Sequence, residues 1–288
     1  MTEEKSFKNL HSKWLDWLEK DEHAICKQLY QMSWDYALFL VVGELGKIAS
    51  QHPKPNIGFN EPILNLLVSG FVTTQAFFIR RLVDKRKDVI SLCRLIDDMK
   101  ENIDVITREN YVCINGLSYD FDEPRKEQKR GFTILDAKDA WPESKIRHEE
   151  FDKLSGVDEN KRNKCDKIKE SFFDDLNKKL ETCKDIQKYS NKYMAHAADE
   201  ESRNKLSEDE KRVTLNKIDE CHKAIFQVFS ALLWVLKNES MISPIPCPQY
   251  DHLKNLDKAW ADDEMMAKAR DIWNKRMKEV QNWKNTSL

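Results

Sequence analysis

Glycine and proline are scarce in this chain, with 7 and 8 residues respectively among 288. Because these residues supply most of the tight turns of β-rich folds, their scarcity argues against a turn-rich β architecture. Charged residues instead make up 34% of the chain and apolar ones 40%, a balance typical of long helices with one solvated face. The composition therefore predicts an all-α protein, long enough for one elaborated domain with a sizeable core.

Other absences restrict the classes of function. With 48 basic and 50 acidic residues, no global field draws the protein onto nucleic acid or an anionic membrane. The seven cysteines form no CxxC pair, the histidines are scattered, and no glycine-rich phosphate loop is present, so we expect no metal and no cofactor. The cysteines are interpreted as reduced core residues.

No long hydrophobic run is present, and the longest, residues 37–42, is too short to cross a bilayer. Residues 1–5 lack the basic and apolar regions of a secretion signal. We therefore expect no membrane association and a cytoplasmic location.

Apolar residues recur every three or four positions over the first 45 residues or so, which predicts one long helix or two end to end. Pro53 and Pro55 interrupt this pattern, and Asn60 is expected to cap the next helix, with Pro62 in its first turn. That helix, about 61–83, is apolar nearly all round, which predicts that it is the central and most buried helix. Asp88 is expected to cap a further helix that reaches about residue 107.

Helical periodicity returns at residues 165–189 and leads into a segment that contains His196. A capping box, Ser207 to Glu210, predicts the start of a helix that runs to about Leu236. These two helices should complete a four-helix core with the preceding pair. Prolines at 244, 246 and 248 end it, so we expect one domain over 1–243 and a helical extension over 244–288, whose charged helix covers about 257–283.

Residues 111–119 change period. Two short β-prone runs flank Asn115-Gly116, the dipeptide that best supports a type I′ turn, which predicts a small β-hairpin inserted in the helical domain. The following residues, about 120–160, are irregular and charged and predict a long connection.

One histidine stands out as a candidate for chemistry. On a helix, Tyr189, Tyr193 and His196 share one face, and Lys192 precedes His196 by one turn. A nearby lysine favours a neutral imidazole, which a general base for a ribose 2′-hydroxyl requires. The alternative interpretation is a histidine that only forms structural hydrogen bonds.

Arg80 and Arg81 end the apolar helix and are followed by Asp84. Either one arginine forms a structural pair with Asp84, or an arginine projects towards His196 and binds a phosphate oxygen. The basic run over residues 125–130 likewise has two interpretations, a solvated loop or a contact with nucleic acid.

Three separated segments together resemble the HEPN superfamily, in particular the abortive-infection U-type HEPN proteins of bacteria. The segments are Phe77–Asp84 with the following Ser91 and Leu92, Tyr111–Asp120, and Tyr189–His196. Their order and spacing are similar to those of the family, and the resemblance covers about residues 20–240.

The resemblance implies a helical bundle that forms a homodimer, with the histidine motifs of two protomers facing a shared cleft. It further implies metal-independent RNA cleavage in phage defence. In that scheme His196 is the general base or acid, Asn191 orients it, and Lys192 or Arg80 stabilises the scissile phosphate. Arg81 and Tyr193 are further candidates for binding the substrate.

Ser190 stands where such proteins usually have arginine. A serine supplies neither the cation nor the paired donors that stabilise the transition state, a loss of about 3 kcal/mol or a hundredfold in rate. Two hypotheses follow: an endoribonuclease with a weak or relocated site, and a catalytically silent HEPN dimer that binds RNA or a protein such as an antitoxin. A third is a helical scaffold whose C-terminal tryptophans dock a partner or the other protomer.

Overall fold

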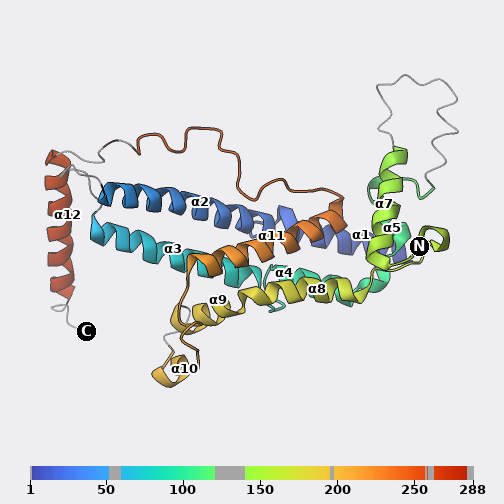
Figure 1. The fold of residues 1–288 in the computed structure, drawn as a ribbon, viewed down its shortest axis with the longest axis horizontal. Coiled ribbons are helices and arrows are strands. Elements are labelled where there is room, and N and C mark those ends of the chain that lie inside the picture. The colour runs from blue at the N-terminus through green and yellow to red at the C-terminus, as the bar shows by residue number, and fades with distance from the viewer. Residues whose placement is uncertain are drawn as a thin grey trace. The chain divides into compact units, whose positions relative to one another are not determined.

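The structure is a computed structural model, and it describes residues 2–51, 60–120, 140–194, 198–256, 258 and 263–283. Over these ranges the regular structure is helical, with one isolated antiparallel bridge between Thr107 and Lys167 and no strand (Figure 1). The all-α prediction is confirmed. The chain divides into two compact units, Met1–Pro246 and Cys247–Leu288.

The first unit contains all but one of the helices that the structure describes. Its principal helices are α1 (Thr2–Leu15), α2 (Ile25–Ser50), α3 (Glu61–Leu82), α4 (Leu92–Glu101), α5 (Arg108–Val112), α7 (Ala140–Ser155), α8 (Glu170–Leu180), α9 (Lys184–Tyr189), α10 (Glu200–Asn204) and α11 (Leu215–Lys237).

Of the two alternatives predicted for the N-terminal stretch, one long helix or two end to end, the structure shows two helices. A π-helical turn, Asp16–Lys20, extends α1, and a tight turn then separates it from α2. In that turn the Asp21 carboxylate accepts a hydrogen bond from the His23 backbone N–H at 2.7 Å. A short Asp side chain that bonds the backbone two residues on competes with helix continuation, which explains the break.

Local capping chemistry sets the start of the next two helices. The Asn60 side chain accepts a hydrogen bond from the Ile63 N–H at 3.1 Å, which confirms the predicted cap of α3. The cap of α4 is Ser91 instead of Asp88, with Ser91 Oγ accepting from the Arg94 N–H at 3.1 Å. Helix α4 also ends at Glu101, well before the predicted residue 107.

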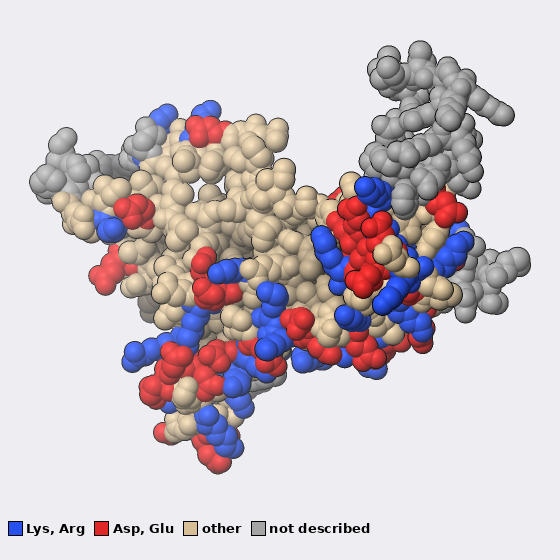
Figure 2. Space-filling view, turned by 45° about the vertical axis from the view of Figure 1, so that its right-hand side comes forward, with Lys and Arg blue, Asp and Glu red and all other residues tan. Residues whose placement is uncertain are grey.

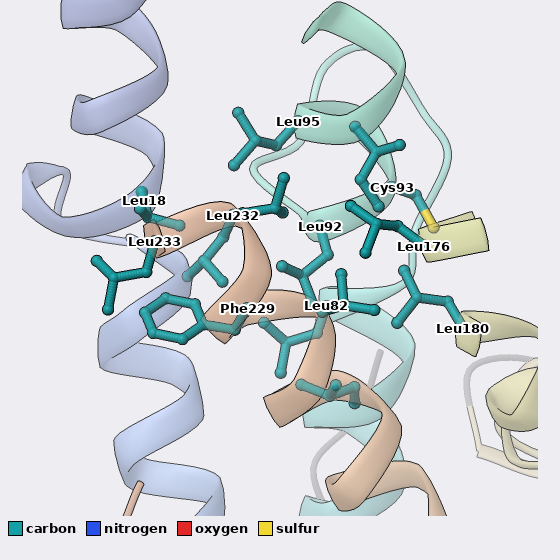
Figure 3. Packing of buried hydrophobic residues seen from close by; sticks show 14 of the residues in the cluster. Leu18, Leu82, Leu92, Cys93, Leu95, Leu176, Leu180, Phe229, Leu232 and Leu233 are labelled. Carbon is teal, nitrogen blue, oxygen red and sulfur yellow. The ribbon is translucent and has the colours of Figure 1, made fainter. Parts of the chain in front are cut away.

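The core lies where α2, α3, α8 and α11 pack together, with α4 against α8. Figure 3 shows leucines of α3, α4 and α8 meeting Phe229, Leu232 and Leu233 of α11. Each of these side chains is buried, and burying one such side chain stabilises the fold by roughly 1.5–3 kcal/mol. The bundle is therefore held chiefly by the apolar face of α11.

A polar link also crosses this bundle. His222 of α11 lies 2.8 Å from Gln75 Oε1 of α3, and Gln75 Nε2 donates to the Met32 carbonyl of α2 at 3.1 Å. Gln75 is fully buried, so these bonds satisfy polar atoms that burial would otherwise leave unpaired. The link fixes the relative register of three helices.

The predicted hairpin at 111–119 is wrong. Thr107 caps α5 through its side chain, Tyr111 and Val112 are buried within that helix, and Ile114–Gly116 form a 3₁₀ turn. Gly116 has a φ of 78°, but Asn115 is not among the residues with positive φ, so the type I′ turn that needs both is absent. Burial against α7 decided the conformation in place of local β-propensity.

The prediction that α3 is the most buried helix is also wrong within the protomer. Its exposed apolar side chains include Leu66, which is 65% exposed, and Phe77, which is 45% exposed. The first half of α3 and the second half of α2 extend beyond the other helices as an antiparallel pair, which we call the α2–α3 arm (Figure 1). In the arm each helix has only the other to cover its apolar face.

Two further boundaries differ from the prediction. Ser207 and Glu210 form the reciprocal bonds of a capping box, at 2.8 and 3.2 Å, but enclose only a turn; α11 begins at Leu215, capped by Thr214. Helix α8 begins at Glu170, so Cys165 lies before it and is exposed. All seven cysteines are free thiols.

The second unit contains α12 (Asp263–Asn282), within the predicted range 257–283. Its apolar side chains form one stripe of the helix and are exposed: Met265, Met266, Ile272, Trp273, Met277 and Val280. Near its end the Arg276 guanidinium lies 4.7 Å from the centre of the Trp283 ring. The Arg276 guanidinium thus covers part of the Trp283 ring at the end of this helix.

Candidate functional site

The motif segment is a helix with a local widening. Helix α9 continues into a π-helical turn, Ser190–Met194, and both pack against α3. The Ala198 N–H then donates to the Lys192 carbonyl at 3.3 Å, and the Asp199 side chain caps α10. A π-turn inside a helix is costly and frequently marks a functional segment, because it rotates the side chains that follow.

His196 lies outside the described residues, together with its two neighbours 195 and 197. Its role as general base or acid therefore stays a prediction. The residues on either side, up to Met194 and from Ala198, are described and define the surroundings of the motif.

Ser190 occupies the interior of the protein. Its side chain is fully buried, and Ser190 Oγ has no hydrogen-bond partner among the described residues. A cationic side chain at this buried position would lose its hydration and could not contact a phosphate group of a bound RNA. The arginine position of the motif is therefore not a substrate-facing position in this chain.

The other predicted motif residues lie nearer the surface. Lys192 Nζ donates to Ser202 Oγ of α10 at 2.6 Å, and Asn191 is half-buried. Tyr193 is 37% exposed, and its ring stacks on that of Tyr189 with 4.9 Å between ring centres. The segment thus presents an aromatic pair and a lysine that is held in place by a neutral hydroxyl, so its positive charge is not cancelled by that partner.

An ion pair fixes the segment from the other side. Lys188 Nζ lies 2.6 Å from a carboxylate oxygen of Glu210. The Lys188 ammonium, together with bonds from Ser207, lowers the pKa of Glu210 to about 2. This pair ties α9 to the turn before α11, so the motif is anchored at both ends.

Arg80 and Arg81 lie in a pocket of about 480 Å³ at the C-terminal end of α3. The structural pairing considered for them is wrong, because Asp84 pairs with Arg86, with Arg86 Nη2 3.0 Å from Asp84 Oδ2. Neither Arg80 nor Arg81 has a hydrogen bond or ion pair within the described part of the chain. Two half-buried guanidinium groups are thus available at this pocket.

The same pocket contains an exposed aromatic ring and a histidine. Phe77 comes from α3 and His23 from the turn before α2, while Asp21 and Asp88 supply negative charge. Guanidinium groups beside an exposed ring are the groups that bind a phosphate and stack on a base. No described residue of the motif lines this pocket, so the structure does not bring Arg80 and Arg81 together with Lys192 or Tyr193.

The described part of the chain contains no group of three or more His, Cys, Asp or Glu side chains suited to a metal. Charged side chains do gather on the protein surface, over α7 and along α8 and α10, and both signs are mixed there (Figure 2). The face shown in Figure 2 therefore carries no broad basic groove.

Sequence reasoning missed a buried cluster between α5, α7 and the segment before α8. Arg108 is fully buried, with Nε 2.7 Å from Asp166 and Nη1 2.8 Å from Asp152. Arg147 and His148 are buried nearby, and burial lowers the pKa of His148. The Arg108–Asp166 pair lies beside the bridge between Thr107 and Lys167, and no local sequence pattern predicts contacts between residues so far apart in the chain.

Comparison with curated proteins and with solved structures finds no match to this chain. Comparison with protein families matches the HEPN AbiU2 family over residues 13–251, a range that contains the π-helical motif segment, His196 and the Arg80 and Arg81 pocket and ends before α12. The match covers well over half of the sequence, and the helical architecture agrees with it. The chain therefore belongs to the HEPN AbiU2 family of abortive-infection proteins.

Proposed function

We propose that this protein acts in bacterial phage defence as a metal-independent endoribonuclease that uses His196. The observation that carries the proposal is that the chain belongs to the HEPN AbiU2 family, matched over residues 13–251, a range that contains His196. The motif segment supports it, since it is anchored at both ends and widened by a π-turn directly before the histidine.

The proposed reaction needs no cofactor. His196 takes the proton of a ribose 2′-hydroxyl, the 2′-oxygen attacks the adjacent phosphorus, and the 5′-oxygen of the next nucleotide leaves with a proton. The products are a 2′,3′-cyclic phosphate and a free 5′-hydroxyl. Asn191 orients the imidazole, and Lys192 or Tyr193 contacts the RNA beside it.

The cation that the motif lacks must come from elsewhere, because Ser190 is buried and uncharged. We assign to Arg80 and Arg81 a neighbouring phosphate of the RNA in place of the scissile one, because their guanidinium groups have no carboxylate partner in the described structure and no motif residue lines their pocket. They lie on α3, the helix against which the motif segment packs. Phosphate binding there would position the RNA strand that runs past His196.

The test is cleavage of total RNA by the purified protein in EDTA. We expect fragments with 2′,3′-cyclic phosphate ends from the wild type and none from His196→Ala. Replacing Arg80 and Arg81 together by Ala should slow cleavage by about a hundredfold. Arg86→Ala is the matched control, since its guanidinium in the same pocket is already paired with Asp84, and it should change the rate much less.

A second candidate function is supported by the burial of Ser190 and by the bond from Lys192 to Ser202. It is a catalytically silent HEPN protein, a homodimer in the cytoplasm, that binds RNA or a protein partner such as an antitoxin. Identical RNA patterns for wild type and His196→Ala, with RNA still retained by both, would support this function and reject the nuclease.

A further inference from the structure

The loop between α3 and α4, residues 83–91, carries side chains into two different pockets. Its residues 84, 86 and 88 line the pocket at the C-terminal end of α3 described above. The two lysines between them, Lys85 and Lys87, line another pocket of about 550 Å³, which we call the α4 pocket. One short loop thus supplies cations to both of the pockets that it lines.

The two lysines are available to a ligand of the α4 pocket. Lys85 and Lys87 are exposed, and neither forms a hydrogen bond or ion pair with another described residue. Glu181, whose carboxylate lies near enough to Lys85 to interact with its charge, is itself paired with Lys184, 2.6 Å from Lys184 Nζ. The charges of Lys85 and Lys87 therefore remain free to attract an anion.

Arg94, in the first turn of α4, is a third cation of the α4 pocket. Its guanidinium lies 4.0 Å from the centre of the Trp17 ring, and its Nη1 donates to the Val89 carbonyl at 2.8 Å. These two contacts fix the guanidinium plane and leave Nη2 without a partner in the described structure. A guanidinium that is already held in place binds a phosphate with little further loss of freedom, and a base can stack on its plane. We call Lys85, Lys87 and Arg94 the cationic end of the pocket.

Carboxylates line the rest of the α4 pocket. Asp97 and Glu101 follow Arg94 along α4, and since α4 rises by 1.5 Å per residue, Glu101 lies about 10 Å beyond Arg94. Helix α8 runs beside α4 (Figure 1), and Glu170 in its first turn lies near Lys100. We call Asp97, Glu101 and Glu170 the acidic end of the pocket.

This division of charge restricts the ligand. A phosphate is attracted by the cationic end and repelled by the acidic end, whereas carboxylates accept hydrogen bonds from hydroxyl and amino groups. The α4 pocket therefore suits a ligand that has an anion on one side and hydrogen-bond donors on the other. A nucleotide has this arrangement, with its phosphate, its ribose hydroxyl and the N–H groups of its base, and the volume lies within the usual range for ligand sites, about 300–1,000 Å³.

We propose that the α4 pocket binds one nucleotide of a single RNA strand that crosses the loop of residues 83–91 and also occupies the pocket of Arg80 and Arg81. The phosphate of that nucleotide lies at the cationic end, and its sugar and base lie towards the acidic end. The inference rests on the proposed function, because it takes RNA as the substrate. A strand, unlike a free nucleotide, gives a reason for cations on both sides of the same loop.

The test is RNA binding by the full chain carrying His196→Ala, in which bound RNA stays intact. The affinity for labelled oligouridines of increasing length is measured by fluorescence anisotropy, and it should rise until the strand reaches the α4 pocket. Adding Lys85→Ala and Lys87→Ala together should remove the later part of this rise and weaken binding of the longest RNA by about tenfold. The slope of log affinity against log salt should fall by about 1.4, since each phosphate contact of a single strand contributes about 0.7.

Lys100→Ala is the matched control. Lys100 lines the same pocket, but its Nζ lies 2.6 Å from a carboxylate oxygen of Asp174, so its charge is already paired. This variant should bind RNA of every length nearly as well as its parent. Circular dichroism should show the same fold for all variants, because Lys85 and Lys87 are exposed. An unchanged affinity after loss of Lys85 and Lys87, or an equal loss in Lys100→Ala, would reject the proposal.

Two competitors test the other possible occupants. Inorganic polyphosphate has the anions of RNA but no donors for the acidic end, so it should displace the labelled strand poorly. Polyphosphate that competes as well as unlabelled RNA would make the pocket a general anion site and reject the proposal. Uridine monophosphate that competes as tightly as the longest RNA would assign the pocket to a free nucleotide and reject it too.

Cleavage of total RNA by the wild type separates this inference from the proposed function. Cleavage that persists while RNA binding is indifferent to Lys85 and Lys87 would reject the inference and leave the nuclease standing. RNA binding that depends on both lysines without any cleavage would reject the nuclease and support the inference.

Discussion

Helices α3 and α11 have nearly the same length, 22 and 23 residues, and both are rich in apolar side chains, yet α11 has ten buried residues and α3 only five. The difference lies in their neighbours. Helix α11 contacts α1, α2, α3, α4 and α8, whereas the first half of α3 extends beyond the bundle with α2. The apolar content of a helix thus predicts how much of its surface favours burial. The neighbouring helices determine how much of that surface is buried within one protomer.

The difference in burial between α3 and α11 is tested most strongly by removing one phenylalanine from each helix. Phe229→Ala in α11 empties a fully buried site and should lower the free energy of unfolding by about 3–5 kcal/mol. Phe77→Ala in α3 removes an exposed ring and should change protomer stability by less than about 0.5 kcal/mol. Urea unfolding at low protein concentration measures both, and equal losses would show that the two helices are covered alike.

The link between the two helices predicts a pH dependence. Burial lowers the pKa of His222 to about 4, against 6.5 in the unfolded chain. Between pH 4 and pH 6.5 the His222 ring of the unfolded chain binds a proton that the ring of the folded protein does not bind. The contribution of neutral His222 to the free energy of unfolding is therefore fully present above pH 6.5 and is lost as the pH falls towards 4. The maximum loss is about 3 kcal/mol.

The measurement is the free energy of unfolding between pH 4 and 7. Burial also lowers the pKa of His11 and His148, so these rings add a loss in the same direction. His222→Gln should therefore flatten most, though not all, of the dependence. An unchanged pH profile in that variant would show that His222 is not the titrating group.

A smaller effect is expected at Ser190, on the segment that packs against α3. Its buried hydroxyl has no hydrogen-bond partner in the described structure, so Ser190→Ala should leave stability unchanged or raise it by up to about 1 kcal/mol. Ser190→Arg, which restores the usual motif residue, should instead destabilise the protein and not accelerate RNA cleavage. Thermal unfolding of both variants checks this, and a stable, more active Ser190→Arg protein would contradict the conclusion that this position does not face the substrate.

The sequence predicted what depends on local chemistry and on period. The Asn60 cap, the break after α2 and the apolar face of α11 follow from capping, proline geometry and helical spacing, and the matched motif segments predicted the family. It failed where a distant contact decides the outcome. Tyr111 and Val112 have β-prone side chains, but α7 offers them a buried helical position.

The site divides in the same way. Spacing predicted that Lys192 and Tyr193 belong to the motif segment, and their roles at the site stay predictions, whereas the burial of Ser190 depends on how helices pack. His23 joins the pocket of Arg80 from the turn before α2, and no local pattern connects positions so far apart in the chain. His196, the residue on which the proposed catalysis depends, lies outside the described ranges.

Amide hydrogen exchange of α3 and α11 at low protein concentration tests the comparison of the two helices most directly. Peptides from the first half of α3, which extends beyond the bundle with α2, should exchange markedly faster than peptides from α11. Equally slow exchange of both sets of peptides would contradict the account.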